Sequence, residues 1–463
     1  MNINKLFTTQ KQAYIDYPLS TAEERIADLE KLKTHIIEKR ENLFEAVHKD
    51  FNGKCIDEVF ITEIIPIIES IKYIVKNIHE WMKPSIRHVN PYFGKINSWV
   101  LYQPLGVVGI VSSWNYPIYL TLNPLVYALS AGNRVMIKTS DLTKNTSAVL
   151  RELLALVFQN EQVCIIPEQK NDIMEFSKLA FDHLFFTGSS KLGKHIMKNA
   201  SEKLTPLTLE LGGKSPAIIA DTAEIESAIE KIIYAKTVNS GQTCIAPDYL
   251  LVHTDLLKTV IRSTYSVFDK FYNDFAHNSQ YGNIINEEHY QRLLGYIEDA
   301  REKGAEILTL GEMTSVVSNR KLPLVIVLHV KMSMKVMQEE IFGPILPIIT
   351  YNDFDEVITI LNQKESPLAI YYFGKNEEQI NKLSVNTRSG SLCINDAMIQ
   401  FVIDDLPFGG VGNSGFGRYH AKEGFINFSN TRSVISNVDS KISHRLQPPY
   451  NGIIVKSFEK YIA

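Results

Sequence analysis

Hydrophobic residues in the N-terminal part of the chain recur three and four positions apart, the spacing of one face of an α-helix. Polar and charged residues fill the positions between them. The pattern predicts two amphipathic helices whose apolar faces pack against a core. The first stripe consists of Ile26, Leu29, Leu32, Ile36 and Ile37, and the second of Ile61, Ile64, Ile65, Ile68, Ile71 and Ile78.

Beyond residue 105, short apolar runs alternate with amphipathic segments. A helix is expected at 120–131, ended by Gly132 and Asn133, and a second one after Thr143 as its N-cap. Alternation of this kind indicates a parallel sheet with helices on both faces. The runs that predict strands are 106–112, 134–138, 163–166 and 183–186, and the apolar face of the second helix holds Leu150, Leu153, Leu154 and Val157.

A second α/β unit is expected at 213–390, where the same alternation continues. The run 99–102 favours a strand that ends segment 91–103 and forms one half of a projecting hairpin. Segment 407–415 holds too many glycines for regular structure. In the second unit, strands are predicted at 215–220, 249–253 and 369–373, and a helix at 222–238.

The bulk composition is that of a globular protein, with 45% hydrophobic and 22% charged residues. A chain of 463 residues is too long to fold around a single hydrophobic core, so two or three domains are expected. The net charge of −4 argues against nucleic acid as a partner.

Residues 96–133 carry no charged side chain, which calls for a membrane test. Pro104, Pro117 and Pro124 interrupt this stretch, so a membrane-spanning helix or anchor is not expected. The first residues lack the apolar core of a secretory signal, which predicts a cytoplasmic protein. The four cysteines form no CxxC pair, and no metal site is predicted.

Two short motifs carry the groups needed for covalent acyl chemistry. Gly241-Gln242-Thr243-Cys244 presents a thiol on a glycine-bearing turn, and Glu210 precedes Leu211-Gly212-Gly213-Lys214. A cysteine nucleophile and a carboxylate base are the parts that such chemistry requires. A third motif places Asn115 in an apolar setting, where its amide is either a turn cap or a donor to an oxyanion.

Two further motifs suit a nucleotide ligand, although each also has a plain structural explanation, and a third segment, 338–344, holds two adjacent carboxylates. Lys138 ends a predicted parallel strand, the edge at which α/β sheets bind nucleotides, but a solvated lysine is common there. Segment 186–193 leads from a strand through Gly188 and Ser189 into a helix, whose free N–H groups suit a pyrophosphate. In 338–344, the adjacent carboxylates Glu339 and Glu340 are most typical of a solvated face.

All these motifs together, in this order from about residue 25 to 434, resemble those of the aldehyde dehydrogenases. The forms at 114–117, 413–417 and 448–450 resemble the class 3 branch of that family. The resemblance implies Cys244 as nucleophile, Glu210 as base and Asn115 as oxyanion donor. It also implies NAD or NADP as cofactor, bound by Lys138, Asp141, Gly188, Ser189, Gly193, Leu211, Glu340 and Phe342.

Two departures from the family pattern concern the cofactor end of the site. The family usually has proline after the lysine and glutamate three places beyond it, where this chain has Thr139 and Asp141. A carboxylate at that place repels a 2′-phosphate, so the choice between NAD and NADP stays open. The residues after Cys164 also lack the glycines that the family usually has.

The resemblance further implies the fold and the assembly: an α/β aldehyde dehydrogenase fold with a Rossmann-like cofactor sheet, a second α/β catalytic domain and a small oligomerisation arm. The chain would form a homodimer. The expected division is 1–85 and 104–212 for the dinucleotide-binding domain, 213–392 for the catalytic domain, 86–103 and 393–440 for the arm and closing segment, and 441–463 for a tail.

The substrate implied by the resemblance is an aldehyde, oxidised to its carboxylate through a thiohemiacetal and a thioester. Tyr116, Tyr234, Met398 and Phe401 fall where the family lines its pocket, and their bulk favours an apolar or aromatic aldehyde. Three alternatives remain: a CoA-acylating relative, a catalytically silent oligomer of the same fold, and a cofactor-free cysteine hydrolase.

Overall fold

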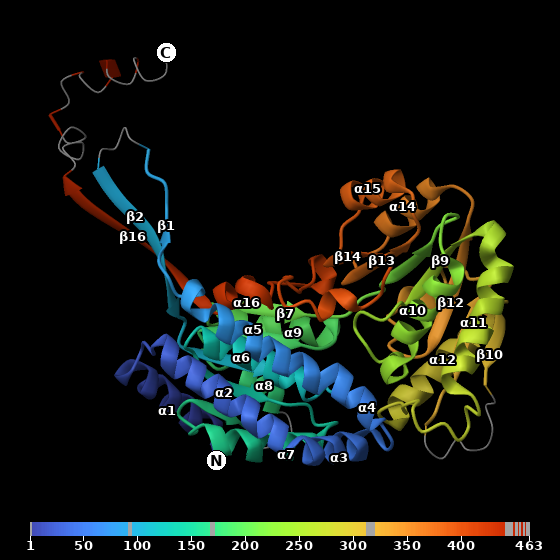
Figure 1. Cartoon of the computed structure of the whole chain (residues 1–463), viewed down its shortest axis with the longest axis horizontal. Coiled ribbons are helices and arrows are strands. Elements are labelled where there is room, and N and C mark those ends of the chain that lie inside the picture. The colour runs from blue at the N-terminus through green and yellow to red at the C-terminus, as the bar shows by residue number, and fades with distance from the viewer. Residues whose placement is uncertain are drawn as a thin grey trace.

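The computed structural model describes residues 2–90, 95–166, 172–311 and 320–439, with positions 448, 449, 452, 455, 456 and 459 beyond them. Two helix-covered sheets lie side by side, and a narrow three-stranded sheet projects from the first (Figure 1). The predicted α/β class is confirmed. Residues 167–169, where the family glycines are missing, residue 450 and most of the predicted tail lie outside the described residues.

The first sheet has six strands in the order β15-β7-β6-β3-β4-β5. All neighbours are parallel except β15, which runs antiparallel to β7. The four strands predicted from the apolar runs correspond to β3, β4, β5 and β6. The strands are β3 (Val107–Val111), β4 (Arg134–Lys138), β5 (Val163–Ile165), β6 (His183–Thr187), β7 (Leu207–Glu210) and β15 (Gly415–Phe416).

Helices cover both faces of this sheet. On one face lie α6 (Tyr119–Ser130) and α7 (Lys144–Val157), with α2 (Ala22–Glu38), α3 (Arg40–Phe51) and α5 (Ile65–Trp81) outside them. The other face carries α1 (Ile3–Asp16), α8 (Asp172–Ser177) and α9 (Ser190–Ser201). Two short turns, α4 (Ile56–Val59) and η1 (Phe60–Ile64), lead into α5, and α16 (Ala421–Asn427) packs on α6.

The two predicted apolar stripes are only partly in the core. Leu29, Leu32 and Ile36 are buried as expected, whereas Ile37 is exposed. In the second stripe, Ile61 and Ile65 are 54% and 39% exposed, so the prediction that they pack in the core was wrong. The reason is η1, a π-helical turn, whose wider winding breaks the 3.6-residue periodicity at this point.

The helix ends show one confirmed and one corrected prediction. Gly132 has φ +87°, and the N–H groups of Gly132 and Asn133 donate to the carbonyls of Leu129 and Ala128, which closes α6 as predicted. Thr143 precedes α7, but its side chain does not cap the helix. The carboxylate of Asp50 accepts from the first N–H groups instead.

The second sheet has seven strands in the order β10-β11-β12-β9-β8-β13-β14, all parallel except the pair β10–β11. Its side chains alternate between two cores: Ala217 and Ile219 face one, and Ile218 the other. The strands are β8 (Pro216–Ile219), β9 (Tyr249–His253), β10 (Glu306–Leu310), β11 (Leu324–Leu328), β12 (Ile345–Tyr351), β13 (Ala369–Phe373) and β14 (Ser391–Ile394).

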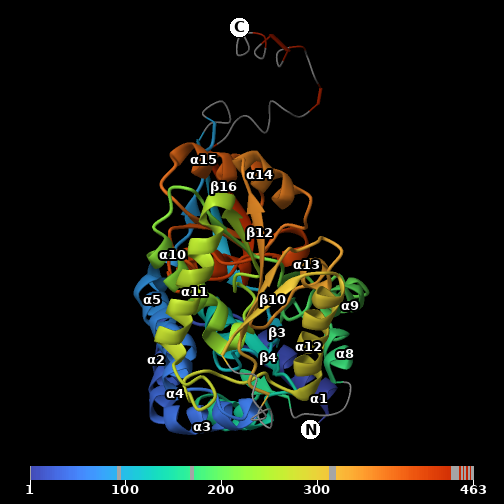
Figure 2. The same ribbon diagram turned by 90° about the vertical axis from the view of Figure 1, so that its right-hand side faces the viewer.

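The helices of the second unit lie on opposite sides of its sheet (Figure 2). One side carries α10 (Ile225–Thr237) and α11 (Leu257–Tyr272). The other carries α12 (Glu287–Glu302), α13 (Lys335–Gln338), α14 (Phe354–Asn362) and α15 (Glu377–Asn386). The short helical turns are η3 (Val238–Gly241), η4 (Thr254–Leu256), η6 (Ile399–Phe401) and η7 (Gly412–Ser414).

The projecting sheet, here called the arm, consists of β1 (Ser85–Ile86), β2 (Lys95–Pro104) and β16 (Ser429–Asp439). The strand predicted at 99–102 lies in β2. Its main antiparallel partner is β16 from the far end of the chain, and β1 pairs with it over two residues only. The division of the chain into domains stays a proposal. Among the described residues no helix is long and apolar enough to cross a membrane.

Candidate active site

Cys244 lies on the wall of a cavity of about 280 Å³. The walls come from η1 and the start of α5, from the start of α6, from α10 and from segment 396–402. All four residues predicted to line a pocket do line this one: Tyr116, Tyr234, Met398 and Phe401. The structure thus brings the thiol and these side chains together, although they are up to 285 positions apart in sequence (401 − 116 = 285).

The turn that precedes Cys244 has an unusual backbone. Asn239, Ser240 and Gly241 have φ of +52°, +53° and +73° in succession, a conformation that side chains rarely adopt. A Cβ on Gly241 would lie 2.6 Å from the carbonyl of Gly343, so only glycine fits there. Side-chain hydrogen bonds hold the turn: Ser240 Oγ donates to Gly282 O, and Gln242 Nε2 donates to Asn239 O at 2.9 Å. Such a strained turn persists only because its surroundings fix it.

Asn115 is buried, and the reactive turn orients its amide. Its Nδ2 donates to Gln242 O at 3.1 Å, while its main-chain oxygen accepts from Asn239 Nδ2 at 2.8 Å. A side-chain amide has two N–H donors. One is used on Gln242, two residues before Cys244, and the second is left for a ligand oxygen.

Glu210 ends β7 and is 4% exposed. Neither of its carboxylate oxygens has a hydrogen-bond partner. Burial raises the pKa of this carboxyl well above its usual range, and the positive charge of Arg418 opposes the rise. A buried carboxyl without partners is costly for folding alone, and a raised pKa suits a general base near neutral pH.

The Cys244 thiol is partly buried and close enough to Glu210 and Glu340 for their charges to act on it. Burial, the negative charge of Glu340 and that of Glu210 raise its pKa to about 12. Hydrogen bonds from the backbone N–H groups of Cys244 and Ile245 act in the opposite direction. In this arrangement the sulfur is a thiol at neutral pH and needs a proton acceptor to become a nucleophile.

Glu340 reaches back to the glycine turn that follows Glu210. Its Oε1 accepts from the Gly213 N–H at 3.0 Å, and a Cβ on Gly212 would lie 2.2 Å from both carboxylate oxygens. Burial raises the pKa of Glu340 to about 7. Lys214 fixes the segment that carries Glu340, because its ammonium pairs with Asp248 and donates to Val336 O and Glu339 O.

Lys138, at the carboxyl end of β4, is 3% exposed. Its ammonium pairs with Asp141 at 2.6 Å and donates to Thr139 O at 3.1 Å. The Asp141 side chain is 60% exposed, so the pair lies at the surface edge of the sheet. The two residues predicted for the adenosine end therefore contact each other.

The turn from β6 into α9 is close-packed where the motif has glycine. A Cβ on Gly188 would lie 2.7 Å from the ring of Phe186, and one on Gly193 would lie 2.9 Å from Leu211 Cδ2. Ser189 is the N-cap of α9 and accepts from the Leu192 N–H at 3.3 Å. The exposed N-terminus of α9 thus faces outward beside β6 and β7.

Phe342 follows Glu340 by two residues and has a left-handed conformation with φ +48°. Its ring packs edge-on against Trp114, with centroids 5.4 Å apart, and Trp114 also contacts His289. Because Trp114 precedes Asn115, this aromatic cluster joins the segment of Glu340 to the segment of Asn115.

Unpartnered polar atoms gather at one edge of the six-stranded sheet. Thr139, Thr187 and Glu210 follow or end strands β4, β6 and β7, and their side-chain oxygens are buried without partners. Strands β6 and β7 are neighbours, and β3 alone separates β6 from β4. Buried polar groups are normally hydrogen-bonded, so these oxygens indicate a polar ligand. Ligands of open α/β sheets bind at this carboxyl edge, and a dinucleotide fits the residues present.

A charged cluster beside Asn115, formed by Lys54, Glu58 and Glu63, was not predicted from the sequence. All three are buried or nearly so, and they precede or lie within α4 and η1. Asn239 and Arg418 were not predicted either. Of these residues, only Asn239 could have been suspected from the sequence, because it lies five residues before Cys244. The charged cluster gave no signal, because buried ion pairs do not differ in sequence from surface ones.

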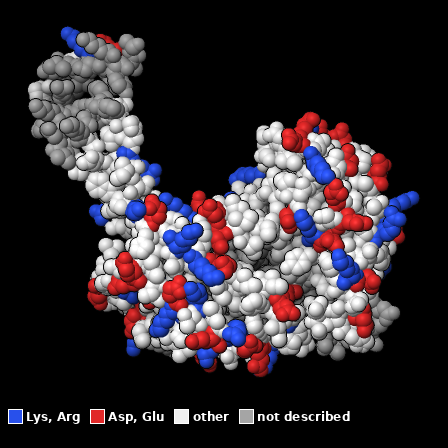
Figure 3. Space-filling view, viewed as in Figure 1, with Lys and Arg blue, Asp and Glu red and all other residues white. Residues whose placement is uncertain are grey.

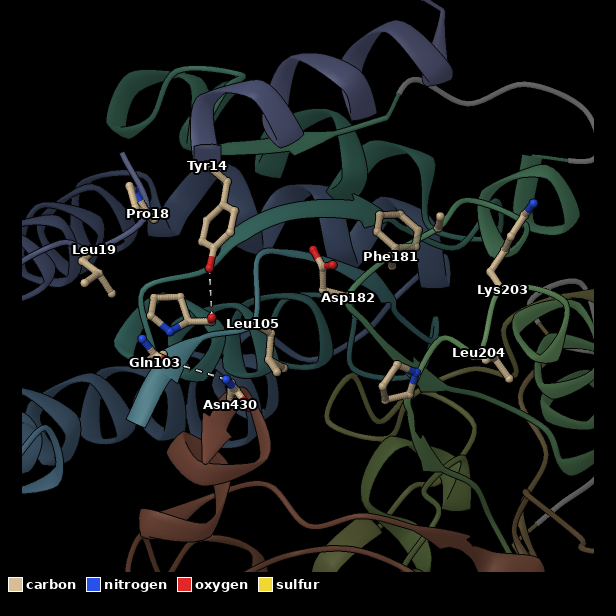
Figure 4. A pocket seen from close by; sticks show the side chains of 13 residues that line it. Tyr14, Pro18, Leu19, Gln103, Leu105, Phe181, Asp182, Lys203, Leu204 and Asn430 are labelled. Carbon is tan, nitrogen blue, oxygen red and sulfur yellow. Dashed lines mark hydrogen bonds between the residues drawn. The ribbon is translucent and has the colours of Figure 1, made fainter. Parts of the chain in front are cut away.

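A second cavity, of about 560 Å³, lies at the opposite, amino-terminal edge of the first sheet (Figure 4). Its polar groups already have partners: Asp182 pairs with Lys11 and accepts from the Val107 N–H, and Tyr14 donates to Pro104 O. On the face shown in Figure 3, acidic and basic side chains are interspersed. In the described part of the chain, no group of three His, Cys, Asp or Glu side chains could hold a metal ion.

Comparisons with known proteins agree on one family. The model of the aldehyde dehydrogenase family matches residues 1–434. A probable coniferyl aldehyde dehydrogenase of Pseudomonas aeruginosa is 43% identical over 454 residues, 98% of this chain and 95% of the relative. Aldehyde dehydrogenase family 3 member A2 of Pongo abelii is 35% identical over 95% of this chain and 90% of its own length.

Solved structures match over the whole length. A substrate-bound AldH of Staphylococcus aureus superimposes with a TM-score of 0.94, at 34% identity and with 100% of both chains covered. Such agreement in sequence and fold leaves one assignment. The chain belongs to the aldehyde dehydrogenase family, in its class 3-like branch, and is an NAD(P)-dependent oxidoreductase that acts on aldehydes.

Proposed function

We propose that Cys244 is the nucleophile, that Asn115 and the Cys244 backbone N–H hold the oxyanion, and that Glu210 is the base. One observation carries this proposal: Cys244 lines the cavity, and the carbonyl that orients the Asn115 amide belongs to Gln242, two residues before it. The unpartnered carboxylate of Glu210 supports its part, because it is free to accept a proton.

The residues act in a fixed sequence. As the Cys244 sulfur attacks the aldehyde carbon, Glu210 takes the thiol proton, directly or through water, and the carbonyl oxygen gains negative charge. The free N–H of Asn115 donates to this oxygen, and losing one such donor typically costs about 3–4 kcal/mol. When bound, the nicotinamide would supply the acceptor for the hydride that leaves the former aldehyde carbon, so that a thioester remains on Cys244. Once the first proton has passed to solvent, Glu210 takes a proton from the water that attacks the thioester carbon on Cys244. The carbon–sulfur bond then breaks, the acid leaves as its carboxylate, and the sulfur regains a proton from Glu210.

For the dinucleotide we propose the residues that line the carboxyl edge of the first sheet. Lys138 and Asp141 would hold the adenosine ribose, and the N-terminus of α9, with Gly188, Ser189 and Gly193, the pyrophosphate. Leu211 would pack beside Gly193, with Glu340 on the nicotinamide ribose and Phe342 near its ring. The orphaned oxygens of Thr139 and Thr187 support this position.

We propose an apolar aldehyde, aliphatic or aromatic, as the substrate. The cavity around Cys244 is lined mainly by apolar side chains, and its one charged pair, Lys231 with Asp396 at 3.2 Å, neutralises itself. Several apolar residues at its wall are also exposed: Ile61, Tyr234, Ile399 and Val402. Each buried methylene contributes about 0.8 kcal/mol, so such walls favour a longer apolar chain over a small charged aldehyde.

The function is tested by kcat/KM for an aldehyde panel with NAD and with NADP: saturated aldehydes of increasing length, benzaldehyde, coniferyl aldehyde, betaine aldehyde and succinic semialdehyde. The two charged aldehydes should be the poorest substrates. A preference for either of them would contradict the proposed substrate class.

The catalytic roles need separate variants. Cys244→Ala should abolish oxidation while dinucleotide binding, measured by titration, survives. Glu210→Gln should slow thioester hydrolysis most, seen as a burst of reduced cofactor followed by a slow steady state. Normal turnover of the alanine variant, or an unchanged deacylation rate in the glutamine variant, would refute the assignment.

A CoA-acylating enzyme is the nearest alternative, since it passes the same thioester to CoA. Glu210 favours water, because a carboxylate base is needed to activate it, and an assay with and without CoA separates the two reactions. The silent oligomer would give no reduced cofactor with any aldehyde. For a cofactor-free hydrolase a histidine partner is needed, and none lies among the residues that line the cavity.

We also propose a cytoplasmic homodimer. All four cysteines are unpaired, which suits a reducing compartment. The arm supports the dimer, since it projects from the body with exposed apolar residues such as Ile86 and Ile435. Cell fractionation tests the location, and the molecular mass in solution tests the dimer.

A further inference from the structure

A buried charged cluster lies behind the wall of the aldehyde cavity. Lys54 Nζ is 3.6 Å from a Glu63 oxygen and 3.9 Å from a Glu58 oxygen. The side chains of Lys54 and Glu63 are 0% exposed and that of Glu58 is 12% exposed. One ammonium therefore lies with two carboxylates in the interior, and none of the three is assigned a role in the chemistry above.

The polar contacts of this cluster end on the two segments that carry the reacting groups. Lys54 Nζ is 3.4 Å from Asn115 O. Glu63 accepts from the N–H groups of Ile118 and Tyr119 at 2.7 and 3.2 Å. Glu58 accepts from the Asn239 N–H at 3.0 Å, at the start of the strained turn before Cys244.

The same ammonium also holds an aromatic wall of the cavity. Lys54 Nζ lies 4.6 Å from the ring centroid of Tyr116, within the range of a cation–π contact. The Tyr116 hydroxyl is 2.6 Å from Thr243 Oγ1, next to Cys244. Lys54 is thus linked to the cavity through both Asn115 and Tyr116.

Stability is a poor reason for this arrangement. Taking three charges out of water is costly, and apolar side chains of similar volume are often as stable or more stable. The lysine–carboxylate distances exceed 3.5 Å, so their attraction is not optimised as a tight ion pair. What the cluster does supply is fixed donors and acceptors for backbone groups that helices and strands leave unpaired.

We propose that Lys54, Glu58 and Glu63 are positioning residues that hold the Asn115 amide and the Asn239–Cys244 turn in register for oxyanion binding. This inference rests on the proposed role of Asn115. The proposed role is positioning rather than binding, because none of the three residues lines the aldehyde cavity. Loss of the cluster should therefore lower the rate of the step in which the oxyanion forms, and leave dinucleotide affinity unchanged.

The experiment is a double-mutant cycle on the complete enzyme, with the single-turnover rate of cofactor reduction as the readout. Lys54→Met alone should slow that rate about 10- to 100-fold, because small displacements of an oriented donor have effects of this size. Asn115→Ala alone should slow it about 100- to 1,000-fold. If Lys54 acts through Asn115, the double variant should be no more than about threefold slower than Asn115→Ala. Multiplicative effects would overturn the inference.

Arg25→Met is the matched control for loss of a buried cation. Arg25 is 4% exposed and donates to Ser130 O and Ser20, away from the cavity. This variant should lower the unfolding temperature as Lys54→Met does, but its effect on the rate, if any, should multiply with that of Asn115→Ala. If Lys54→Met and Arg25→Met show the same coupling to Asn115→Ala, the rate effect reflects a general loss of rigidity in the protein. That result would overturn the inference.

A second variant covers the case in which Lys54→Met does not fold. Glu63→Gln keeps an oxygen that accepts from Ile118 and Tyr119, whereas Glu63→Ala does not. In the same cycle, the single-turnover rate of Glu63→Ala should be lower than that of Glu63→Gln. Neither substitution should slow the reaction further when Asn115→Ala is already present. Equal rates for the two Glu63 variants would also contradict the inference.

Two further readouts accompany the cycle. KM for the cofactor and the rate of Cys244 alkylation should stay within about twofold of wild type in the Lys54 variant, since neither depends on the oxyanion donor. If Asn115→Ala itself leaves the rate unchanged, the proposed role of Asn115 fails. If that variant is slow and the Lys54 effect multiplies with it, only the positioning role fails.

Discussion

Cys244 ionises against the charge of two carboxylates, which is the main electrostatic fact of this site. Glu340 and Glu210 both raise the pKa of the thiol, after burial itself. Each carboxyl also has a raised pKa, to about 7 for Glu340 and well above the usual range for Glu210, because the same burial penalises their charged forms. Neutralising either carboxylate should therefore lower the pKa of the thiol and change the reactivity of the sulfur.

The first prediction concerns Glu340→Gln. Removing this negative charge favours the thiolate, so the Cys244 pKa should fall and its alkylation by iodoacetamide at pH 8, without cofactor, should become about three- to tenfold faster. Mass spectrometry of the Cys244 peptide measures the rate. Cys55 is partly exposed and provides an internal control whose rate should not change. A slower or unchanged rate at Cys244 would mean that Glu340 does not oppose its ionisation.

A second prediction concerns the choice between NAD and NADP. Asp141 pairs with the Lys138 ammonium. In the proposed cofactor site, its negative charge lies where a 2′-phosphate would bind. In Asp141→Asn the lysine becomes available to the phosphate, so the ratio of kcat/KM for NADP to that for NAD should rise. Because Asp141 is mostly exposed, solvent screening limits the rise to about three- to fivefold. Asp141→Glu keeps the charge and should leave the ratio near wild type; an equal rise in both variants would disprove the electrostatic reason.

At the scale of elements, the strands were the most predictable part of the chain. β3, β4, β6, β9 and β13 correspond to uninterrupted apolar runs, because strands buried on both faces need no polar alternation. The same runs placed Lys138 at a strand end, and with it one edge of the proposed site, whereas β7, which ends at Glu210, was not among the predicted strands. The family motifs then placed the pocket residues, which local patterns alone could not bring together.

Elements fixed by distant contacts could not be predicted. Thr143 fits a cap by type, but Asp50, which lies in α3, takes the helix N–H groups. The π-helical turn η1 has no sequence signal, and it exposes Ile61 and Ile65. The left-handed Asn239 and Ser240 are set by hydrogen bonds to Asn115, Gln242 and Gly282 rather than by their own preference.

The exposure of Ile61 gives a third prediction, at the mouth of the cavity. Ile61 lines the cavity and is 54% exposed, so the distal part of a long aldehyde would contact it. Ile61→Ser should reduce the gain in kcat/KM with each added methylene, normally about three- to fourfold, for the longest aldehydes only. Short aldehydes should be unaffected. Leu156→Ser, at a 50% exposed position on α7, is the matched control and should leave the whole series unchanged. A uniform loss at every length would argue against contact with the distal chain.

At the scale of the whole molecule, the arm is the part whose stability contacts within a single chain do not explain. Its three strands leave the body of the protein, and β2 and β16 pair along nearly their whole length (Figure 1). At the base of the arm, Tyr102 packs against Phe425 of the body, with ring centroids 5.7 Å apart. An isolated sheet of this size needs a hydrophobic face covered by something else to be stable. Exposed Ile86 and Ile435, at 78% and 69%, are available for a second copy of the chain.

The last prediction is that Ile435→Asp converts the proposed dimer into a monomer. Placing a carboxylate in an apolar contact costs several kcal/mol per subunit when it is buried without a partner, enough to shift an equilibrium by orders of magnitude. Light scattering after gel filtration gives the mass, and a monomer of 52.6 kDa is the expected result. Leu204→Asp, at an 88% exposed leucine on the body, is the control and should stay a dimer. If the two variants have the same mass as wild type, the arm does not form the interface; if wild type is itself a monomer, the dimer proposal is wrong.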